Sequence, residues 1–280
     1  MRTRAGRTLR YSTLVLCPGL VEDWEATPGL RAGSALFTVP PEPASCGPTA
    51  LKPLFMACDH WRRTGVLTDL ELRLVLPEQS AVGIPEADEV VDRALATYGV
   101  EVLREARIER VDPDAHSVTV ATRTGRRVIE DVDVAHAVPH YRAPRWIADS
   151  GLAADPTPGL VDIDPYTLRH RSHASIWGLG DAATVTTRPS GGALRRQVAI
   201  MAHNLAADRS GAPMQRYDGY TVVPITMGRR MLMLAEFTRD GRPAPSVPFV
   251  DPIKPRRATW WLDRYALPQV YWRRILRGRV

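Results

Sequence analysis

The strongest chemical signal in the sequence is a glycine–aspartate pair that follows an apolar run. Residues 175–179 (SIWGL) are typical of a buried strand, and Gly180 and Asp181 come directly after them. Glycine lets the backbone approach a ligand closely, and a carboxylate can accept hydrogen bonds from the hydroxyl groups of a polyol. A predicted helix follows, and a helix N-terminus favours an anionic group. The pattern suggests a nucleotide site, although a plain strand-to-helix turn with an aspartate cap would have the same sequence.

Three cysteines supply the other candidate chemistry. Cys17 follows the apolar run 11–16 and precedes the strand-ending pair Pro18 and Gly19, while Cys46 and Cys58 lie further along the chain. A sparse, odd set of cysteines argues against the disulfide framework of a small secreted protein. A thiolate is the nucleophile that sulfur chemistry requires. The alternative for each cysteine is a buried, inert thiol, and Cys58, on the apolar face of a predicted helix, fits that alternative.

Histidine pairs offer a weaker signal. His136 with His140, and His170 with His173, have spacings that a metal ion could use. No cluster of cysteines or carboxylates accompanies either pair, so the sequence predicts no metal site.

The elements that must position these residues follow from hydrophobic periodicity and turn residues. Helices are predicted over 50–63, 86–98 and 191–208. Strands are predicted over 11–16, 35–39, 70–77, 100–109, 117–121, 126–129, 133–138, 160–163 and 176–179, with 117–129 as a hairpin and Pro139 ending 133–138. The last seventy residues are expected to be irregular. This order predicts an α/β nucleotide-binding fold with a β-meander crossover.

Composition places the chain among ordinary globular proteins. Of its 280 residues, 44% are hydrophobic and 24% charged, which suits one large or two medium domains. The sequence contains no run of eighteen apolar residues, so it predicts no transmembrane helix. Residues 254–280 hold eight basic residues and one acidic one, a net charge of +7, so the rest of the chain is close to neutral. A near-neutral body with a basic, aromatic tail does not indicate a nucleic-acid-binding protein.

Read together, these segments resemble the sulfide:quinone oxidoreductases, particularly the mitochondrial-type branch. The matching stretches keep their order along nearly the whole chain, and Tyr-Asp-Gly-Tyr followed by Leu-Ala-Glu-Phe is the most diagnostic of them. They are CGP at 46–48, DHWRRTG at 59–65, GLVDID at 159–164, TLRH at 167–170, GLGD at 178–181, YDGYT at 217–221, LAEF at 234–237, YW at 271–272 and LRG at 276–278.

The resemblance implies an α/β FAD/NAD(P)-binding fold of the two-dinucleotide-domain flavoprotein type. It implies an FAD enzyme that oxidises sulfide and passes electrons to a membrane quinone. The expected division is a remnant of the first FAD-binding domain and the crossover at 1–34, a second nucleotide-binding-like domain at 35–139, a return to the first domain at 140–210, and a quinone- and membrane-facing region at 211–280.

Site residues carried over from the resemblance are expected to meet around one flavin ring. Cys46 matches the first redox cysteine of the family and is the expected catalytic thiol. FAD is expected to be held by the following residues: Pro18, Gly19, Pro139, Gly180, Asp181 and Gln197, with helix 191–208 beside the isoalloxazine edge. The prolines before Cys46 leave no glycine-rich phosphate turn, which argues against NAD(P)H as the electron donor.

Three departures from the family pattern are present in the sequence. The Gly-x-Gly-x-x-Gly segment expected upstream of 11–16 is absent, so we expect an incomplete chain or a second polypeptide that supplies the missing half. Ala182 stands where the family has its second redox cysteine, and Pro189 stands where a lysine is expected. These departures leave two alternatives open, a flavoprotein with another electron donor and a non-catalytic fragment or subunit.

The tail adds a prediction about location. Residues 260–277 mix tryptophan, tyrosine, leucine and arginine, the composition of a segment that lies in a membrane interface. In the family this region contacts the membrane and guards the quinone entrance. We therefore expect a cytoplasmic protein held on the inner face of the cell membrane. A docked pair of helices with a solvated basic face is the alternative.

Overall fold

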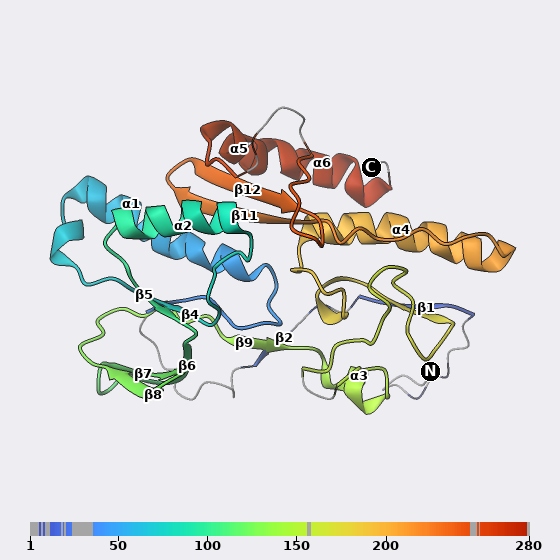
Figure 1. Ribbon diagram of the computed structural model, residues 1–280, viewed down its shortest axis with the longest axis horizontal. Coiled ribbons are helices and arrows are strands. Elements are labelled where there is room, and N and C mark those ends of the chain that lie inside the picture. The colour runs from blue at the N-terminus through green and yellow to red at the C-terminus, as the bar shows by residue number, and fades with distance from the viewer. Residues whose placement is uncertain are drawn as a thin grey trace. The chain divides into compact units, whose positions relative to one another are not determined.

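The computed structural model describes residues 6, 8, 12–17, 19, 21–23, 36–155, 158–246, 251 and 253–278. The chain divides into two compact units (Figure 1). Unit 1 comprises residues 1–21 and 142–221, and unit 2 comprises 22–141 and 222–280. Each unit is therefore built from segments that are far apart in the sequence. Short strands β2 (Val21–Asp23) and β9 (His140–Arg142) pair where the chain passes from one unit to the other.

Unit 1 contains a parallel pair of strands and one long helix. Strand β1 (Leu14–Leu16) pairs with β10 (Ile176–Gly178), which leads into the short 3-10 helix η5 (Gly180–Ala182). Helix α4 (Gly191–Ser210) begins at Ser190, whose side chain accepts a hydrogen bond from the Ala193 amide, and it ends at Gly211 in the left-handed conformation. The unit also holds the short helix α3 (Arg145–Asp149).

Unit 2 contains a parallel three-stranded sheet covered by two helices. Its strands are β3 (Phe37–Thr38), β4 (Arg73–Leu76) and β5 (Glu101–Arg104), in that order. A 3-10 turn, η3 (Gly47–Ala50), leads into helix α1 (Leu51–Thr64), which ends at Gly65. Another, η4 (Leu67–Asp69), precedes β4. Helix α2 (Pro85–Thr97) starts with proline at its first position, where a missing amide hydrogen costs nothing.

Two antiparallel arrangements complete unit 2. The β-meander consists of β6 (Arg107–Asp112), β7 (Ser117–Thr122) and β8 (Gly125–Ile129). A long hairpin follows later in the chain, formed by β11 (Thr221–Gly228) and β12 (Met231–Phe237). Helix α5 (Arg257–Trp261), the π-helical turn Leu262–Ala266 and α6 (Leu267–Arg273) then run on without a break, and a last 3-10 turn spans Ile275–Arg277.

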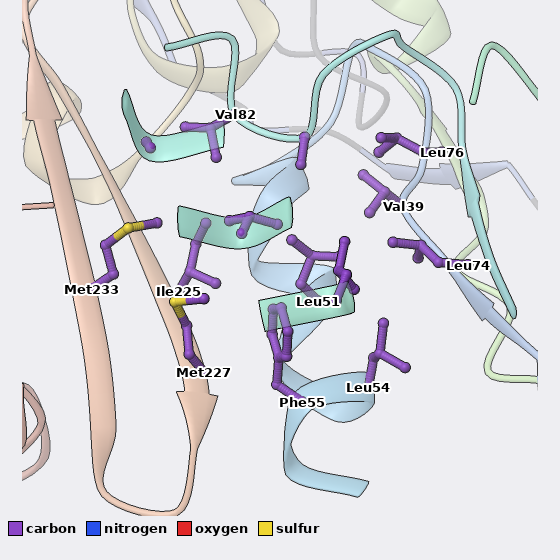
Figure 2. Packing of buried hydrophobic residues seen from close by; sticks show 14 of the residues in the cluster. Val39, Leu51, Leu54, Phe55, Leu74, Leu76, Val82, Ile225, Met227 and Met233 are labelled. Carbon is purple, nitrogen blue, oxygen red and sulfur yellow. The ribbon is translucent and has the colours of Figure 1, made fainter. Parts of the chain in front are cut away.

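The main core of unit 2 joins α1 to elements on both of its sides. Figure 2 shows Leu51, Leu54 and Phe55 of α1 between side chains of β4 and side chains of the β11–β12 hairpin. These three α1 residues are fully buried. Burial of each such side chain contributes about 1.5–3 kcal/mol, so the hairpin, α1 and the sheet stabilise one another. The labelled partners are Leu74 and Leu76 on the sheet side and Ile225, Met227 and Met233 on the hairpin side.

The structure confirms the predicted helices and the 117–129 hairpin but corrects four other predictions. Residues 100–109 form two strands, because Glu105 adopts a φ of 52° and breaks the run. Residues 133–138 form no strand, and Pro139 precedes strand β9 instead of ending one. Residues 160–163 make only isolated bridges. The last seventy residues are largely regular, with the β11–β12 hairpin and the α5–α6 helical stretch.

Candidate functional site

The Gly180–Asp181 turn and Cys17 lie at the same edge of the unit 1 sheet. Strands β1 and β10 are parallel and in register, with Leu16 opposite Gly178. The residues that follow the two strands must therefore emerge side by side. In open parallel sheets the crevice at the carboxyl ends of the strands is where ligands bind. The apolar pattern of the sequence predicted these two strands and the turn after each of them. It did not predict that the two turns lie close together.

Gly180 is required at its position for two reasons. Its φ of +71° favours glycine, and a Cβ atom there would lie 3.2 Å from Cys17 Sγ and 3.5 Å from Leu194 Cδ1. A side chain would therefore be both strained and crowded. Glycine is therefore the residue that this turn accommodates, and the approach of a ligand to its backbone stays a prediction.

Gln197 holds the Gly180 turn in place from helix α4. Its side chain is buried, and its Oε1 accepts a hydrogen bond from the Gly180 amide at 2.9 Å. Gln197 Nε2 in turn donates to the Tyr217 hydroxyl at 3.4 Å, and that hydroxyl donates to the Tyr220 carbonyl. The resemblance implied Gln197 as a cofactor residue, but the sequence contains no signal for its two hydrogen bonds, because their partners are 17 and 20 residues away.

Cys17 is close to this turn, but its environment disfavours a thiolate. Although the residue is exposed, its sulfur lies beside Gly180. The loss of solvation there, together with the nearby negative charge of Asp181, raises the pKa of the Cys17 thiol. A thiol that stays protonated is a poor nucleophile. This electrostatic setting does not favour Cys17 as a sulfur-handling thiol.

Cys46 is held in unit 2 by a strained turn. It has φ 50° and ψ 47°, a left-handed conformation that is uncommon for residues other than glycine. Its carbonyl oxygen accepts hydrogen bonds from the amide and the hydroxyl of Thr49, both at 2.8 Å. The residue is partly exposed. Backbone strain of this kind is often found at functional sites.

A hollow of about 400 Å³ lies beside Cys46, and we call it the Lys52 hollow. Ser45 and Gly47, the neighbours of Cys46 on either side, line it, as does Pro139. The other lining residues are Pro40, Thr49, Ala50, Lys52, Pro53, His136, Ala137, Val138 and Tyr141. The hollow lies wholly within unit 2. A larger hollow of about 500 Å³, over the β-meander, contains none of the predicted site residues.

The predicted site residues thus fall into two groups. Gly180, Asp181 and Gln197 are together in unit 1, while Cys46 and Pro139 are at or beside the Lys52 hollow in unit 2. Gly19 belongs to unit 1, and Pro18 lies outside the described residues. The meeting of Cys46 and Asp181 across one flavin ring stays a prediction.

Ala182 occupies the position of the family's second redox cysteine, and the structure shows how it is placed. Its side chain is fully buried in the η5 turn, and its carbonyl accepts a hydrogen bond from the Val161 amide at 2.8 Å. Cys58 is also fully buried, and burial raises the pKa of its thiol to about 11. The prediction that Cys58 is a core residue is confirmed, which leaves Cys46 as the thiol best suited to chemistry.

His170 has a structural role and not a metal-binding one. It is buried, its Nδ1 accepts a hydrogen bond from the Ser172 amide, and its Nε2 lies 3.1 Å from the Leu152 carbonyl. These partners require a neutral ring that is protonated on Nε2. His173 packs against it, with ring centroids 4.8 Å apart. Within the described part of the chain, no three histidine, cysteine or acidic residues are grouped as a metal site would need.

Acidification is expected to destabilise unit 1 through His170. Burial lowers the pKa of this histidine below its ordinary value, the nearby His173 adds to the effect, and the Leu152 carbonyl and Asp162 oppose it. As the pH falls below about 6.5, the unfolded chain binds a proton before the folded chain does, so the free energy of unfolding decreases. Urea unfolding between pH 8 and pH 5 should show this slope, and His170→Gln should flatten it. An unchanged slope in His170→Gln, or an equal flattening in the exposed His173→Gln, would contradict the assignment.

Several curated proteins are similar to this chain in sequence. No family model matches the chain. It is 27% identical to the mitochondrial sulfide:quinone oxidoreductase of Dictyostelium discoideum over 99% of its length, and 26% identical to that of Mus musculus over 91%. The Schizosaccharomyces pombe protein of the same name is 25% identical over 99% of the chain. The chain spans 57% to 68% of the length of these curated relatives.

Solved structures show the same fold. A chain in the mitochondrial ATP synthase structure of Tetrahymena thermophila matches with a TM-score of 0.79 and 20% identity, covering 96% of this chain and 74% of that one. The sulfide:quinone oxidoreductase of Aquifex aeolicus matches with a TM-score of 0.77 and 14% identity, covering 97% and 71%. The fold is therefore the predicted α/β FAD/NAD(P)-binding fold. Across nearly its whole length the chain is similar in sequence to the mitochondrial sulfide:quinone oxidoreductases, and the resemblance inferred from its motifs is confirmed.

Proposed function

We propose that the chain is the flavin- and quinone-facing part of an FAD-dependent oxidoreductase that oxidises sulfide to a sulfane sulfur species and reduces a membrane quinone. The observation that carries the proposal is the similarity to sulfide:quinone oxidoreductases over up to 99% of the chain. The Gly180–Asp181 turn, held by Gln197 at the ends of two parallel strands, supports the cofactor part of it.

The turn in unit 1 supports the proposal that FAD binds there. Gly180 leaves the backbone bare, the Asp181 carboxylate can accept hydrogen bonds from the ribityl hydroxyls, and Gln197 fixes the orientation of the turn. Gly19, Pro139 and Pro18 are proposed to lie near the cofactor, as their positions in the family pattern imply. When bound, the flavin would accept the two electrons that sulfide gives up.

Cys46 is proposed to be the thiol that takes the sulfur atom. It is partly exposed, whereas Cys58 is fully buried and the Cys17 thiol has a raised pKa. Ala182 supplies no second thiol, so a disulfide between Cys46 and position 182 cannot form. The lack of a second thiol favours one alternative, a flavoprotein of the same fold that takes its electrons from another donor.

Anaerobic reduction of the FAD-loaded protein tests the substrate. Sulfide should bleach the visible absorbance of the flavin, and a quinone should restore it. NADH and NADPH serve as the comparison donors, because the proline-rich turn before Cys46 replaces a glycine-rich phosphate turn. Bleaching by another reductant with none by sulfide would favour the alternative donor.

The C-terminal helical stretch is the proposed membrane contact. Trp261 and Trp272 are 58% and 66% exposed, and four arginines accompany them in residues 264–277. The other large apolar residues that are exposed here are Tyr265, Leu267, Tyr271 and Leu276. No helix in the described ranges has the length and apolar character needed to cross a bilayer. The proposal is attachment at the surface, on the inner face of the cell membrane, close to the quinone pool.

Binding to vesicles should depend on both lipid charge and salt. Each cation near an anionic surface contributes about 1 kcal/mol, so Arg273→Gln should weaken binding to anionic vesicles by roughly fivefold at low salt. Co-sedimentation with vesicles of rising anionic lipid content measures the effect, and Arg195→Gln on α4 is the control. Absence of binding at low salt would leave the docked-helix alternative for this stretch.

A further inference from the structure

The Tyr-Asp-Gly-Tyr-Thr motif at residues 217–221 makes buried contacts with helix α4. Tyr217, Tyr220 and Thr221 are buried, and Gly219 has a φ of +77° that suits glycine at the turn between the two tyrosines. The motif is the last segment of unit 1, so it belongs to the same compact unit as α4 and the Gly180 turn. Its hydroxyl groups can therefore act on that turn through α4.

The hydroxyl of Tyr217 belongs to a series of hydrogen bonds that can run in only one direction. The Gly180 amide can only donate, so the atom of Gln197 that faces it at 2.9 Å must be the oxygen Oε1. The Tyr220 carbonyl can only accept, so the single proton of the Tyr217 hydroxyl points to it. The lone pairs of that hydroxyl are then left for Gln197 Nε2, which donates to it at 3.4 Å. We call these four residues the Gln197 network, and the backbone groups at its two ends fix every donor in it.

The same motif holds the start of helix α4 by a second series of this kind. The Thr221 hydroxyl donates to the Arg188 carbonyl at 2.8 Å, so the 2.9 Å bond between the two hydroxyls must be donated by Ser190. The Ser190 hydroxyl in turn accepts the Ala193 amide at 3.0 Å and so caps the helix. Helix α4 is thus tied to the motif at its cap and again at Gln197.

The Tyr217 hydroxyl adds to the preference of Gln197 for one orientation. A half-turn of the last torsion of glutamine exchanges its oxygen and its NH2 group at nearly the same shape. With the NH2 group toward Gly180, two donors would face each other in a buried place, because Gln197 is only 1% exposed. An acceptor on the other side of the side chain, at Tyr217, disfavours that turned state.

We propose that Tyr217 is a positioning residue for the Gly180 turn and acts through Gln197. Its hydroxyl keeps Gln197 Oε1 on the Gly180 amide, and this bond holds the turn in the conformation that a ligand meets. The positioning role follows from the Gln197 network alone. Only the identity of the ligand, FAD, rests on the proposed function.

Hydrogen exchange of the Gly180 amide in the unliganded protein tests this role without a cofactor. Tyr217→Phe retains the ring and removes the hydroxyl, so this amide should exchange about tenfold faster, the factor that corresponds to one hydrogen bond. Exchange in α4 around Asn204 reports general opening of unit 1 and is the reference for the ratio. Tyr220→Phe is the matched control, because it retains the carbonyl to which Tyr217 donates, and it should leave the ratio unchanged.

Combination with Gln197→Leu shows whether Tyr217 acts through Gln197. Once leucine has removed the acceptor of the Gly180 amide, the addition of Tyr217→Phe should change its exchange by less than about twofold. Thr221→Val breaks the series at the helix cap, which does not include Gln197, so its factor should be the same in both backgrounds. An unchanged ratio in Tyr217→Phe, or an equal factor for Tyr217→Phe in both backgrounds, would overturn the positioning role.

Titration with FAD separates this role from the proposed cofactor. If the turn holds FAD, Tyr217→Phe should weaken the affinity of the folded protein by about fivefold, the loss expected for one indirect hydrogen bond. If the native protein bound no FAD while the exchange results held, the positioning role of Tyr217 would stand and only the proposed cofactor would be removed. FAD binding that is equally tight in the native protein and in a Tyr217→Phe variant with faster exchange would show that the cofactor does not use this turn.

Discussion

Replacement of Cys46 by serine is expected to slow sulfide-driven flavin reduction by more than about a hundredfold. A serine hydroxyl remains protonated at neutral pH and cannot form the sulfur–sulfur bond that a thiolate forms. Serine is close in size to cysteine and the substitution changes no residue of the Gly180 turn, so the affinity for FAD should be unchanged. Anaerobic stopped-flow measurement of flavin bleaching gives the rate, and flavin titration gives the affinity.

The other cysteines provide controls for this experiment. Cys17→Ser removes a thiol with a raised pKa and should change the rate by less than about threefold. Ala182→Cys places a thiol at the position of the family's second redox cysteine, and a faster reaction would show that the missing thiol limits this chain. Equal rates for the native protein and Cys46→Ser would rule out Cys46 as the sulfur-handling residue and favour the alternative donor.

Elements with a local signal could be predicted from the sequence. Helix α1 ends at Gly65 in the left-handed conformation, and its buried residues recur at helical spacing. The hairpin between Ser117 and Ile129 turns at Arg123 and Thr124, and β8 begins at Gly125, whose positive φ follows the turn. In each case the residues that determine the structure are neighbours in the sequence, so periodicity and turn chemistry were sufficient.

Elements that depend on distant partners could not be predicted. The β11–β12 hairpin is buried by α1, and its strands are nearly continuous apolar runs, one of which contains Pro224. Such runs lack the alternation that identifies a strand. The break at Glu105 needs a positive φ at a residue type that rarely adopts it, so no turn signal marks it.

The same distinction applies to the candidate site. The residue types of the Gly180–Asp181 turn indicated a ligand-binding strand end. That Cys17 lies against Gly180, 163 positions later in the chain, depends on the pairing of β1 with β10. The polar lining of the Lys52 hollow likewise comes from two distant segments, residues 45–52 and 136–141. The second segment is held by hydrogen bonds between Thr38 and the backbone of His136 and Val138. Pairings across such distances leave no pattern in one sequence.

Replacement of Gln197 by leucine is expected to loosen the Gly180 turn. Leucine is similar in size but cannot accept the hydrogen bond from the buried Gly180 amide, which is 2.9 Å from Gln197 Oε1 in the native protein. A buried donor without a partner costs about 1–3 kcal/mol, so the free energy of unfolding should fall by that amount. If the turn holds FAD, the affinity of the folded protein for FAD should also fall, by roughly tenfold or more.

Asn204 separates these two effects. It is also buried on helix α4, and it makes hydrogen bonds to the Thr167 carbonyl and to the amide and carbonyl of Gln215. Asn204→Leu should therefore destabilise unit 1 at least as much as Gln197→Leu, because more backbone groups lose partners. It does not touch Gly180, so the affinity of its folded form for FAD should match that of the native protein. Equal losses of FAD affinity in the two variants would mean that general destabilisation, and not the support of Gly180, explains the Gln197 result.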